Sequence, residues 1–136
     1  MSKPQTKRAN GRIQVKTYEP TPFDETAGAP SLVEIHVTEK FEGDIQGEGV
    51  VRFIQAARAD GSATFVGIER VRGSIHGKNG TFLLQDTGTL VGKEVKGEWF
   101  VVAGSGTDEL RGLRGEGGFS ANLGENATIW LEYSFE

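Results

Sequence analysis

Short segments with the alternating pattern of a β-strand recur along the chain, and turn residues separate them. No long stretch places apolar residues at the i, i+3, i+4 and i+7 spacing of an amphipathic helix. The 136 residues include 20 glycines, which suit tight turns because glycine adopts positive φ freely. The chain is therefore predicted to be all-β. The expected strands are Arg12–Glu19, Leu32–Phe41, Glu48–Ala57, Ala63–His76, Thr81–Leu90, Glu94–Ala103, Gly118–Asn122 and Ala127–Phe135.

Turn chemistry predicts where the first strands end. Pro20-Thr21-Pro22 is expected to break the first strand, because proline lacks the N–H that a central ladder needs. Gly43-Asp44 and Asp60-Gly61 are typical turn pairs after the second and third strands. The fourth and fifth strands are expected to form a hairpin with a two-residue turn at Lys78-Asn79 or at Asn79-Gly80.

Consecutive antiparallel strands with short connections form a meander, and such a sheet must bury one face. Closing the sheet buries that face and removes exposed strand edges. The last segment favours closure, since Ile129, Leu131, Tyr133 and Phe135 form an unbroken apolar face. We predict a small closed antiparallel up-and-down barrel of about eight strands, with an open sandwich as the alternative. A barrel of that size is filled by side chains or holds one small ligand.

Composition and charge limit the classes of partner. The net charge is −4 with both signs mixed along the chain, so neither nucleic acid nor a membrane surface is expected as a partner. Residues 1–11 are polar and mildly basic and are predicted to be a disordered tail, with one barrel domain at 12–136. The chain has no cysteine and no apolar signal segment, which predicts a cytoplasmic protein.

Glu69 is the most unusual residue of the predicted strands. Its neighbours on the same face are apolar or glycine, and the opposite face of that strand carries Arg70 and Arg72. Glu69 is therefore expected to point into the barrel. A buried carboxylate is unfavourable unless it is neutral, paired or used in chemistry. The structural alternative is that Glu69 bonds to turn amides, to Trp99 Nε1 or to Tyr133.

Asp86 is expected to share the lumen with Glu69. Both two-residue turns put Asp86 on the Glu69 face, because they differ by an even shift in register. In the first register the two carboxyls are diagonal neighbours, about 7–8 Å apart at the backbone. Two acids in one apolar lumen raise one pKa, which provides an acid and a base. The alternative is a structural aspartate at the rim, near Gly88.

The other lumen residues follow from the same alternation. The candidate substrate-binding residues are Val51, Phe53, Gln55, Phe65, Trp99 and Tyr133. His36 and His76 fall on outward faces without a second ligand at metal spacing, so no metal site is expected. Nothing in the sequence calls for an organic cofactor.

Three spaced motifs carry a family resemblance: Gly43-Asp44-Ile45-x-Gly47-x-Gly49, Gly67-x-Glu69-Arg70-Val71-x-Gly73 and Gly104-Ser105-Gly106-Thr107-x-x-Leu110-x-Gly112-Leu113-x-Gly115. The chain resembles a bacterial family known only as a domain of unknown function, whose members adopt an allene oxide cyclase-like barrel. The resemblance covers nearly all of Gly11–Phe135 and implies a small closed barrel. Glu69 matches the family motif, whereas Asp86 departs from the family pattern. The plant cyclases' own sequence pattern is missing, so none of their catalytic residues is carried over.

Three hypotheses about function follow. The first is a cofactor-independent enzyme of the cyclase or isomerase type, with Glu69 as general acid or base assisted by Asp86 or Gln55. The second is a lipocalin-like protein that binds a hydrophobic small molecule without transforming it. The third is a filled, purely structural barrel, and a cavity of roughly 300 Å³ or more near Glu69 would favour the first two. Self-association is also considered, with Trp130 on the outer face as the candidate contact.

Overall fold

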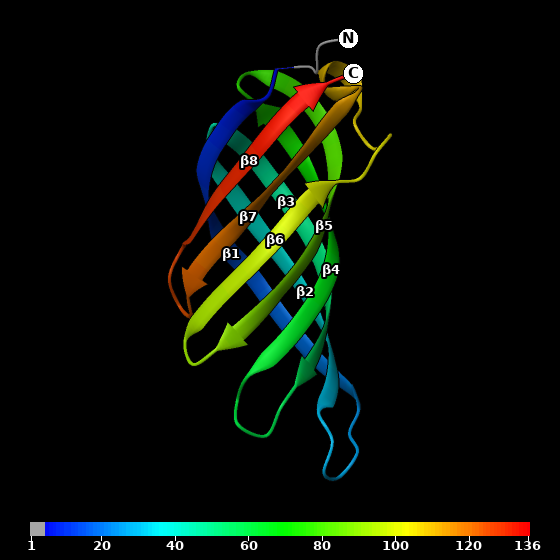
Figure 1. Ribbon diagram of the computed structural model, residues 1–136, viewed down its shortest axis with the longest axis vertical. Coiled ribbons are helices and arrows are strands. Elements are labelled where there is room, and N and C mark those ends of the chain that lie inside the picture. The colour runs from blue at the N-terminus through cyan, green and yellow to red at the C-terminus, as the bar shows by residue number, and fades with distance from the viewer. Residues whose placement is uncertain (1–4) are drawn as a thin grey trace.

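Each strand pairs with its chain neighbours, and β1 pairs with β8 to close the barrel (Figure 1). The computed structural model describes residues 5–136. The eight antiparallel strands confirm the predicted up-and-down barrel. Their bounds are β1 Lys7–Asp24, β2 Ser31–Gly43, β3 Ile45–Ala57, β4 Ala63–Ile75, β5 Lys78–Val91, β6 Glu94–Val101, β7 Leu113–Asn122 and β8 Ala127–Phe135, with a single 3-10 turn, η1, at Asp108–Leu110.

The first strand is longer than predicted at both ends. Residues 7–11, expected in the tail, belong to β1 because they pair with β8 up to Ile13. The part of the tail prediction that concerns residues 1–4 lies outside the described residues. The prolines at 20 and 22 do not break the strand, contrary to the prediction. Beyond Ile13 the strand pairs with β2 alone, so a residue without an N–H is tolerated on its free edge.

The β4–β5 turn also differs from the prediction. It falls at His76-Gly77, and Ile75 pairs with Lys78, so both predicted turn positions are wrong. His76 and Gly77 have φ values of 47° and 81°, as type I′ hairpin turns require. Asn79 and Gly80 lie inside β5 instead. The register still differs from the predicted ones by an even number of residues, so Asp86 shares the face of Glu69 as predicted.

Strand β7 begins earlier than predicted, at Leu113, because its glycines serve close packing rather than turns. A side chain at Gly117 would begin 2.0 Å from the carbonyl oxygen of Trp130 on β8. Glycine in a strand interior often marks such a close approach of two backbones. Residues 113–117, which precede the predicted start of this strand at Gly118, therefore belong to it.

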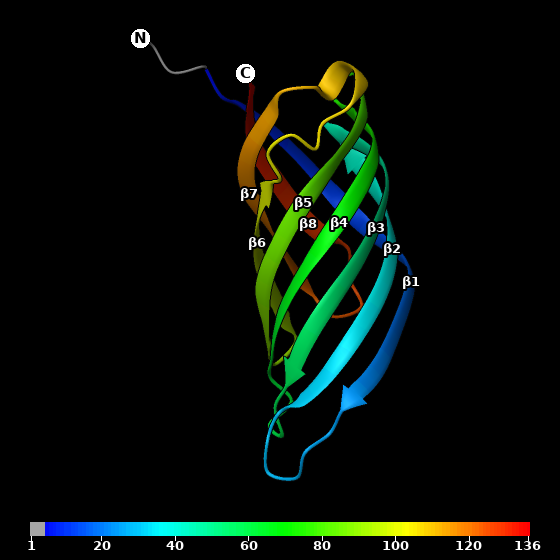
Figure 2. The same ribbon diagram turned by 90° about the vertical axis from the view of Figure 1, so that its right-hand side faces the viewer.

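The two ends of the barrel differ. The start of β1, the C-terminus and η1 lie at one end, and the long β1–β2 hairpin extends from the other (Figures 1 and 2). Leu110 of η1 is fully buried, and Gly80 leaves room for it on β5. Large apolar side chains fill this end and close it, including Phe41, Ile45, Ile75, Phe82, Leu110 and Leu113.

Several apolar side chains are exposed on the outer surface, and some of them lie close together. Trp130, the residue expected to mediate self-association, is half-buried because the Arg8 guanidinium lies 4.6 Å from its ring centre. Exposed aliphatic side chains gather instead on the outside of β3 and β4, at Val50, Ile54, Val66 and Ile68. Within residues 5–136, no helix is long and apolar enough to cross a membrane.

Gly73 and Gly47 provide a direct test of the barrel packing. They face each other across β3 and β4, and a side chain at Gly73 would begin 1.8 Å from the carbonyl oxygen of Gln46. Because that atom belongs to the backbone, Gly73→Ala is expected to destabilise the protein by about 3 kcal/mol. Chemical denaturation measures the effect, with Ser74→Ala as the neighbouring control. A loss as small as that of Ser74→Ala would contradict the packing.

Candidate functional site

Three carboxylic acids from three strands are buried inside the barrel. Glu69 and Asp86 are each 1% exposed, and Glu39 is 8% exposed. Glu69 on β4 pairs with Val51 and Leu84, while Asp86 on β5 pairs with Gly67 and Trp99. Glu39 on β2 pairs with Gly49 on β3, which in turn pairs with Val71 on β4. Glu39 therefore lies one row of inward-facing residues away from Glu69, toward the closed end of β4. Glu69 therefore lies in the row between the other two acids.

Gly49 makes room for the central carboxyl. It sits opposite Glu39 on β3, and a side chain there would begin 2.2 Å from Glu69 Oε2 and 2.8 Å from a ring carbon of Phe41. The Glu69 carboxyl thus occupies space that a larger residue at position 49 would take. The missing side chain allows Glu69 to reach across β3 toward Glu39.

Burial raises the pKa of all three acids, and repulsion from neighbouring acids adds to the shifts of Glu69 and Asp86. Burial raises the pKa of Glu69 well above its usual range, and the charge of Glu39, a hydrogen bond with Glu39 and the charge of Asp86 raise it further. Burial also raises the pKa of Glu39, and the same hydrogen bond partly offsets this effect. Burial and the charge of Glu39 raise the pKa of Asp86 to about 8. Both members of the Glu39–Glu69 pair therefore have a raised pKa, which favours a proton held between them.

The donors that sequence reasoning considered for Glu69 bond elsewhere. Trp99 Nε1 donates to the carbonyl oxygen of Trp130 at 3.0 Å, and the Tyr133 hydroxyl bonds to His76 Nδ1. Glu69 Oε2 and Asp86 Oδ1 are buried without a hydrogen-bond partner in the described part of the chain. Neither Trp99 nor Tyr133 is therefore the partner of Glu69. Asp86 is also fully buried rather than placed at a rim.

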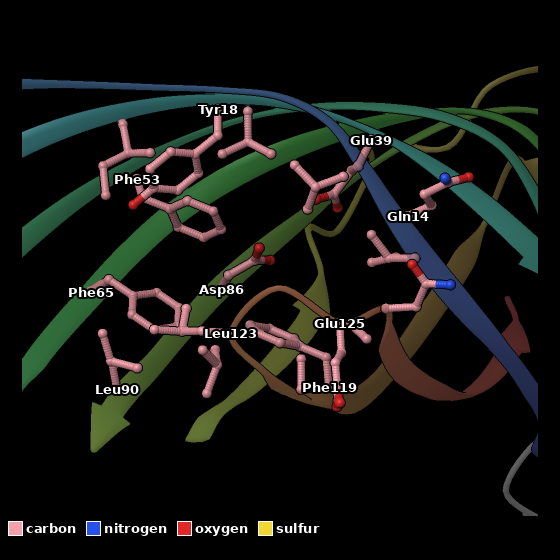
Figure 3. Close-up of a pocket in the computed structure, with 18 of the residues that line it drawn as sticks. Gln14, Tyr18, Glu39, Phe53, Phe65, Asp86, Leu90, Phe119, Leu123 and Glu125 are labelled. Atoms are coloured by element: carbon pink, nitrogen blue, oxygen red, sulfur yellow. The ribbon is translucent and has the colours of Figure 1, made fainter. Parts of the chain in front are cut away.

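The acids line a cavity of about 620 Å³ in the lumen. Figure 3 shows the carboxyls of Glu39 and Asp86 pointing into it, with Phe53 and Phe65 alongside. The mouth lies where β1 no longer pairs with β8, between Gln14–Tyr18 and the β7–β8 loop, residues 123–126. The pairing register between β1 and β2 shifts around Lys16, which forms a β-bulge. Val15 consequently pairs with Glu39, and Tyr18 pairs with Val37. Bulges of this kind often re-aim side chains beside functional sites.

Aromatic rings form much of the apolar wall, and most of them pack over a glycine of a neighbouring strand. The ring of Phe53 occupies the space above Gly67, and that of Phe65 the space above Gly88. Phe53 and Phe65 meet edge to face, with ring centres 5.1 Å apart. Trp99 and Phe119 complete the wall, also 5.1 Å apart. The glycines of the strands therefore set the shape of the cavity.

The structure brings together most of the candidate residues and separates two of them. Glu69, Asp86, Phe53, Gln55, Phe65 and Trp99 line the cavity. Val51 is buried beside Glu69 but does not line the cavity. Tyr133 lies with the side chains that fill the closed end, bonded to His76. His76 lies in the β4–β5 turn, with Nε2 3.5 Å from Asp44.

Glu39 is the functional candidate that the sequence reasoning missed. It alternates with Ile35, Val37 and Phe41 on the inward face of β2, so the pattern that found Glu69 also points to Glu39. Its chain neighbours Thr38 and Lys40 are also polar, so the alternation of apolar and polar residues is lost around Glu39. In residues 5–136, no group of three histidine, cysteine, aspartate or glutamate side chains is arranged to hold a metal ion.

Comparisons with known proteins agree with this barrel. A family model described as "Protein of unknown function (DUF3224)" matches residues 9–133. A crystal structure at 1.84 Å resolution, of a protein with unknown function from the DUF3224 family of Shewanella oneidensis MR-1, superposes with a TM-score of 0.79. The two chains are 28% identical, and the match covers 97% of this chain and 99% of the other. No curated protein matches the sequence. Since the family model spans nearly the whole barrel, the chain belongs to the DUF3224 family.

Proposed function

We propose that the barrel is a cofactor-independent enzyme of the isomerase or cyclase type, which acts on a compact, mostly apolar small molecule in its lumen. One observation carries the proposal: Glu69 Oε2 and Asp86 Oδ1 are buried and unpartnered among the described residues, and both acids line a cavity of about 620 Å³. Such groups are unfavourable for folding, so a bound molecule is the natural partner for them. The cavity volume falls within the usual range for small-molecule sites.

The Glu39–Glu69 pair supports acid and base roles. The Glu69 pKa is raised the further of the two, so we assign the role of general acid to Glu69 and that of general base to the Glu39 carboxylate. An isomerisation removes one proton from the substrate to Glu39 and returns one from Glu69 at another atom. Transfer of the proton from Glu39 to Glu69 across their hydrogen bond then restores the starting state. Asp86, with a pKa of about 8, is protonated at neutral pH and positions the substrate.

The side chains that line the cavity support a mostly apolar substrate. Phe53, Phe65, Trp99 and Phe119 offer apolar surface, and Gln55 adds a polar group. The resemblance to allene oxide cyclase-like barrels also supports a reaction inside a hydrophobic lumen. The same walls would suit a lipocalin-like protein that binds without transforming its ligand, and the experiment below separates the two functions.

The test combines a ligand screen with a search for turnover. Compounds that raise the melting temperature of the protein are incubated with it and followed by NMR for conversion. Glu69→Gln is expected to lower the rate of conversion about 100-fold or more, because the general acid is lost. Its melting temperature should be no lower, since glutamine has the same shape. Glu98→Gln, on the outward face of β6, is the control and should leave the rate unchanged.

The outcomes separate the hypotheses. Conversion that is unaffected by Glu69→Gln would remove Glu69 from the mechanism. Ligands that bind in the lumen but are never converted would support the lipocalin-like alternative. A lumen that binds no compound would contradict both functions.

A further inference from the structure

The charged residues that line the cavity are all acidic. Glu39, Glu69 and Asp86 lie inside, and Glu125 lies at the mouth. Across residues 5–136, no lysine, arginine or histidine contributes to the lining. The arginines of β4, Arg70 and Arg72, are exposed on the outer face. Charges interact strongly in a cavity with apolar walls, so this lining attracts cations and repels anions.

The unpartnered carboxyl oxygens require donors that the barrel does not supply. Glu69 and Asp86 are each 1% exposed, and neither Oε2 of the first nor Oδ1 of the second has a partner in the described chain. The Trp99 indole, which pairs in register with Asp86, donates to Trp130 instead. An ammonium group carries several N–H donors and a positive charge, which satisfies both needs at once.

The aromatic wall suits the rest of such a molecule. Figure 3 shows Asp86 beside the rings of Phe53 and Phe65. Phe65 also approaches Phe119, with ring centres 6.2 Å apart, so the rings form one continuous surface. Ring faces attract cations and also pack against apolar groups. The cavity therefore offers an acidic anchor next to a surface for a hydrophobic body.

We propose that the molecule bound in the lumen is a hydrophobic amine, whose ammonium group pairs with Asp86 and Glu69 and whose apolar body packs against Phe53, Phe65 and Phe119. This inference rests on the proposed function, because it names the substrate class of the same site. It also excludes fatty acids and other carboxylates as ligands. In this arrangement Asp86 is the charged partner of the ammonium group and Glu69 accepts a hydrogen bond from it, while Glu69 and Glu39 still share the proton that the proposed reaction moves.

Proton release is one consequence of the pairing. The titratable groups that face the cavity are Tyr18 from β1, Glu39 from β2, Glu69 from β4, Asp86 from β5 and Glu125 from the β7–β8 loop. Asp86 holds a proton at neutral pH and must release it to pair with an ammonium group. Binding of an amine should therefore tighten as the pH rises from about 6 to about 8.

The test uses three probes of matched shape and different charge: 2-phenylethylamine, 2-phenylethanol and phenylacetate. Isothermal titration calorimetry with the full chain measures their affinities at neutral pH. The amine is expected to bind at least about tenfold more tightly than the alcohol, and phenylacetate more weakly than either. Titrations in two buffers with different ionisation heats should show proton release for the amine and none for the alcohol.

Variants test which carboxyl groups bind the ammonium group. Asp86→Asn and Glu69→Gln should each weaken amine binding about tenfold or more while leaving the affinity for the alcohol within about twofold. Glu98→Gln should change neither. The pH dependence of the unaltered protein provides a second readout, in case a variant does not fold.

Two results would overturn the inference in different ways. Alcohol or phenylacetate binding as tightly as the amine would contradict the amine class and leave the proposed function standing. Binding of none of the three probes would contradict both the amine class and the lumen as a ligand site.

Discussion

Raising the pH from about 5 to about 8 is expected to lower the free energy of unfolding of this protein by several kcal/mol. Asp86 has a pKa of about 8 in the folded barrel, against an ordinary value of 3.8. Between those values the unfolded chain has released the proton that the folded protein keeps. Unfolding therefore releases a proton, and stability falls by roughly 1 kcal/mol for each pH unit and each such group. Glu69 and Glu39, whose pKa values are also raised, act in the same direction.

Urea denaturation across this pH range measures the effect. The stability should be highest at the acidic end of the window and level off above about pH 8, once Asp86 is ionised in both states. Asp86→Asn should reduce the slope, whereas Glu98→Gln should leave it as it is. A stability that is constant or rises toward pH 8 would show that the carboxyls are not held in their neutral form.

Replacing Glu69 with leucine is expected to stabilise the protein by about 2–4 kcal/mol at pH 8. The neighbours of Glu69 in register are Val51 and Leu84, so leucine meets apolar side chains where Oε2 of the carboxyl has no partner in the described structure. The substitution removes a desolvated acid and keeps a similar volume, and the hydrogen bond with Glu39 is the one interaction of the carboxyl that it loses. The variant should also lose amine binding and turnover, as expected when a functional group is kept at the expense of stability.

Thermal and urea denaturation at pH 8 test this prediction. Glu48→Leu is the control, since Glu48 lies on the exposed face of β3 and its replacement should change stability by less than about 0.5 kcal/mol. If Glu69→Leu destabilised the barrel instead, the hydrogen bond with Glu39 would outweigh the cost of burying the Glu69 carboxyl, and Glu69 would have a structural role.

Much of the barrel could be predicted from alternation and turn residues. Glu69 and Asp86 reach the lumen in every two-residue turn considered, because an even shift of register keeps each side chain on its face. The prediction of their shared face therefore survives an incorrect turn. His76-Gly77 was harder to identify than Asn79-Gly80, since the left-handed conformation of His76 depends on tertiary contacts such as its bond to Tyr133.

Other features depend on contacts between distant segments. The extension of β1 through its prolines depends on β8 pairing with β1 only as far as Ile13. That same early end of pairing produces the mouth of the cavity. The volume of the lumen depends on rings packing over glycines of neighbouring strands, such as Phe65 over Gly88. Neither feature can be derived from one strand at a time.

The most direct test of the central claim is an NMR titration of the side-chain carboxyl carbons of Glu39, Glu69 and Asp86. These acids are desolvated together in the lumen, and Asp86 keeps its proton at neutral pH. We therefore expect a midpoint near 8 for Asp86 and a midpoint well above the usual range for Glu69. Asp86→Asn and Glu69→Gln assign the resonances. Midpoints near 4 for all three acids, the ordinary value for exposed carboxyls, would contradict the claim.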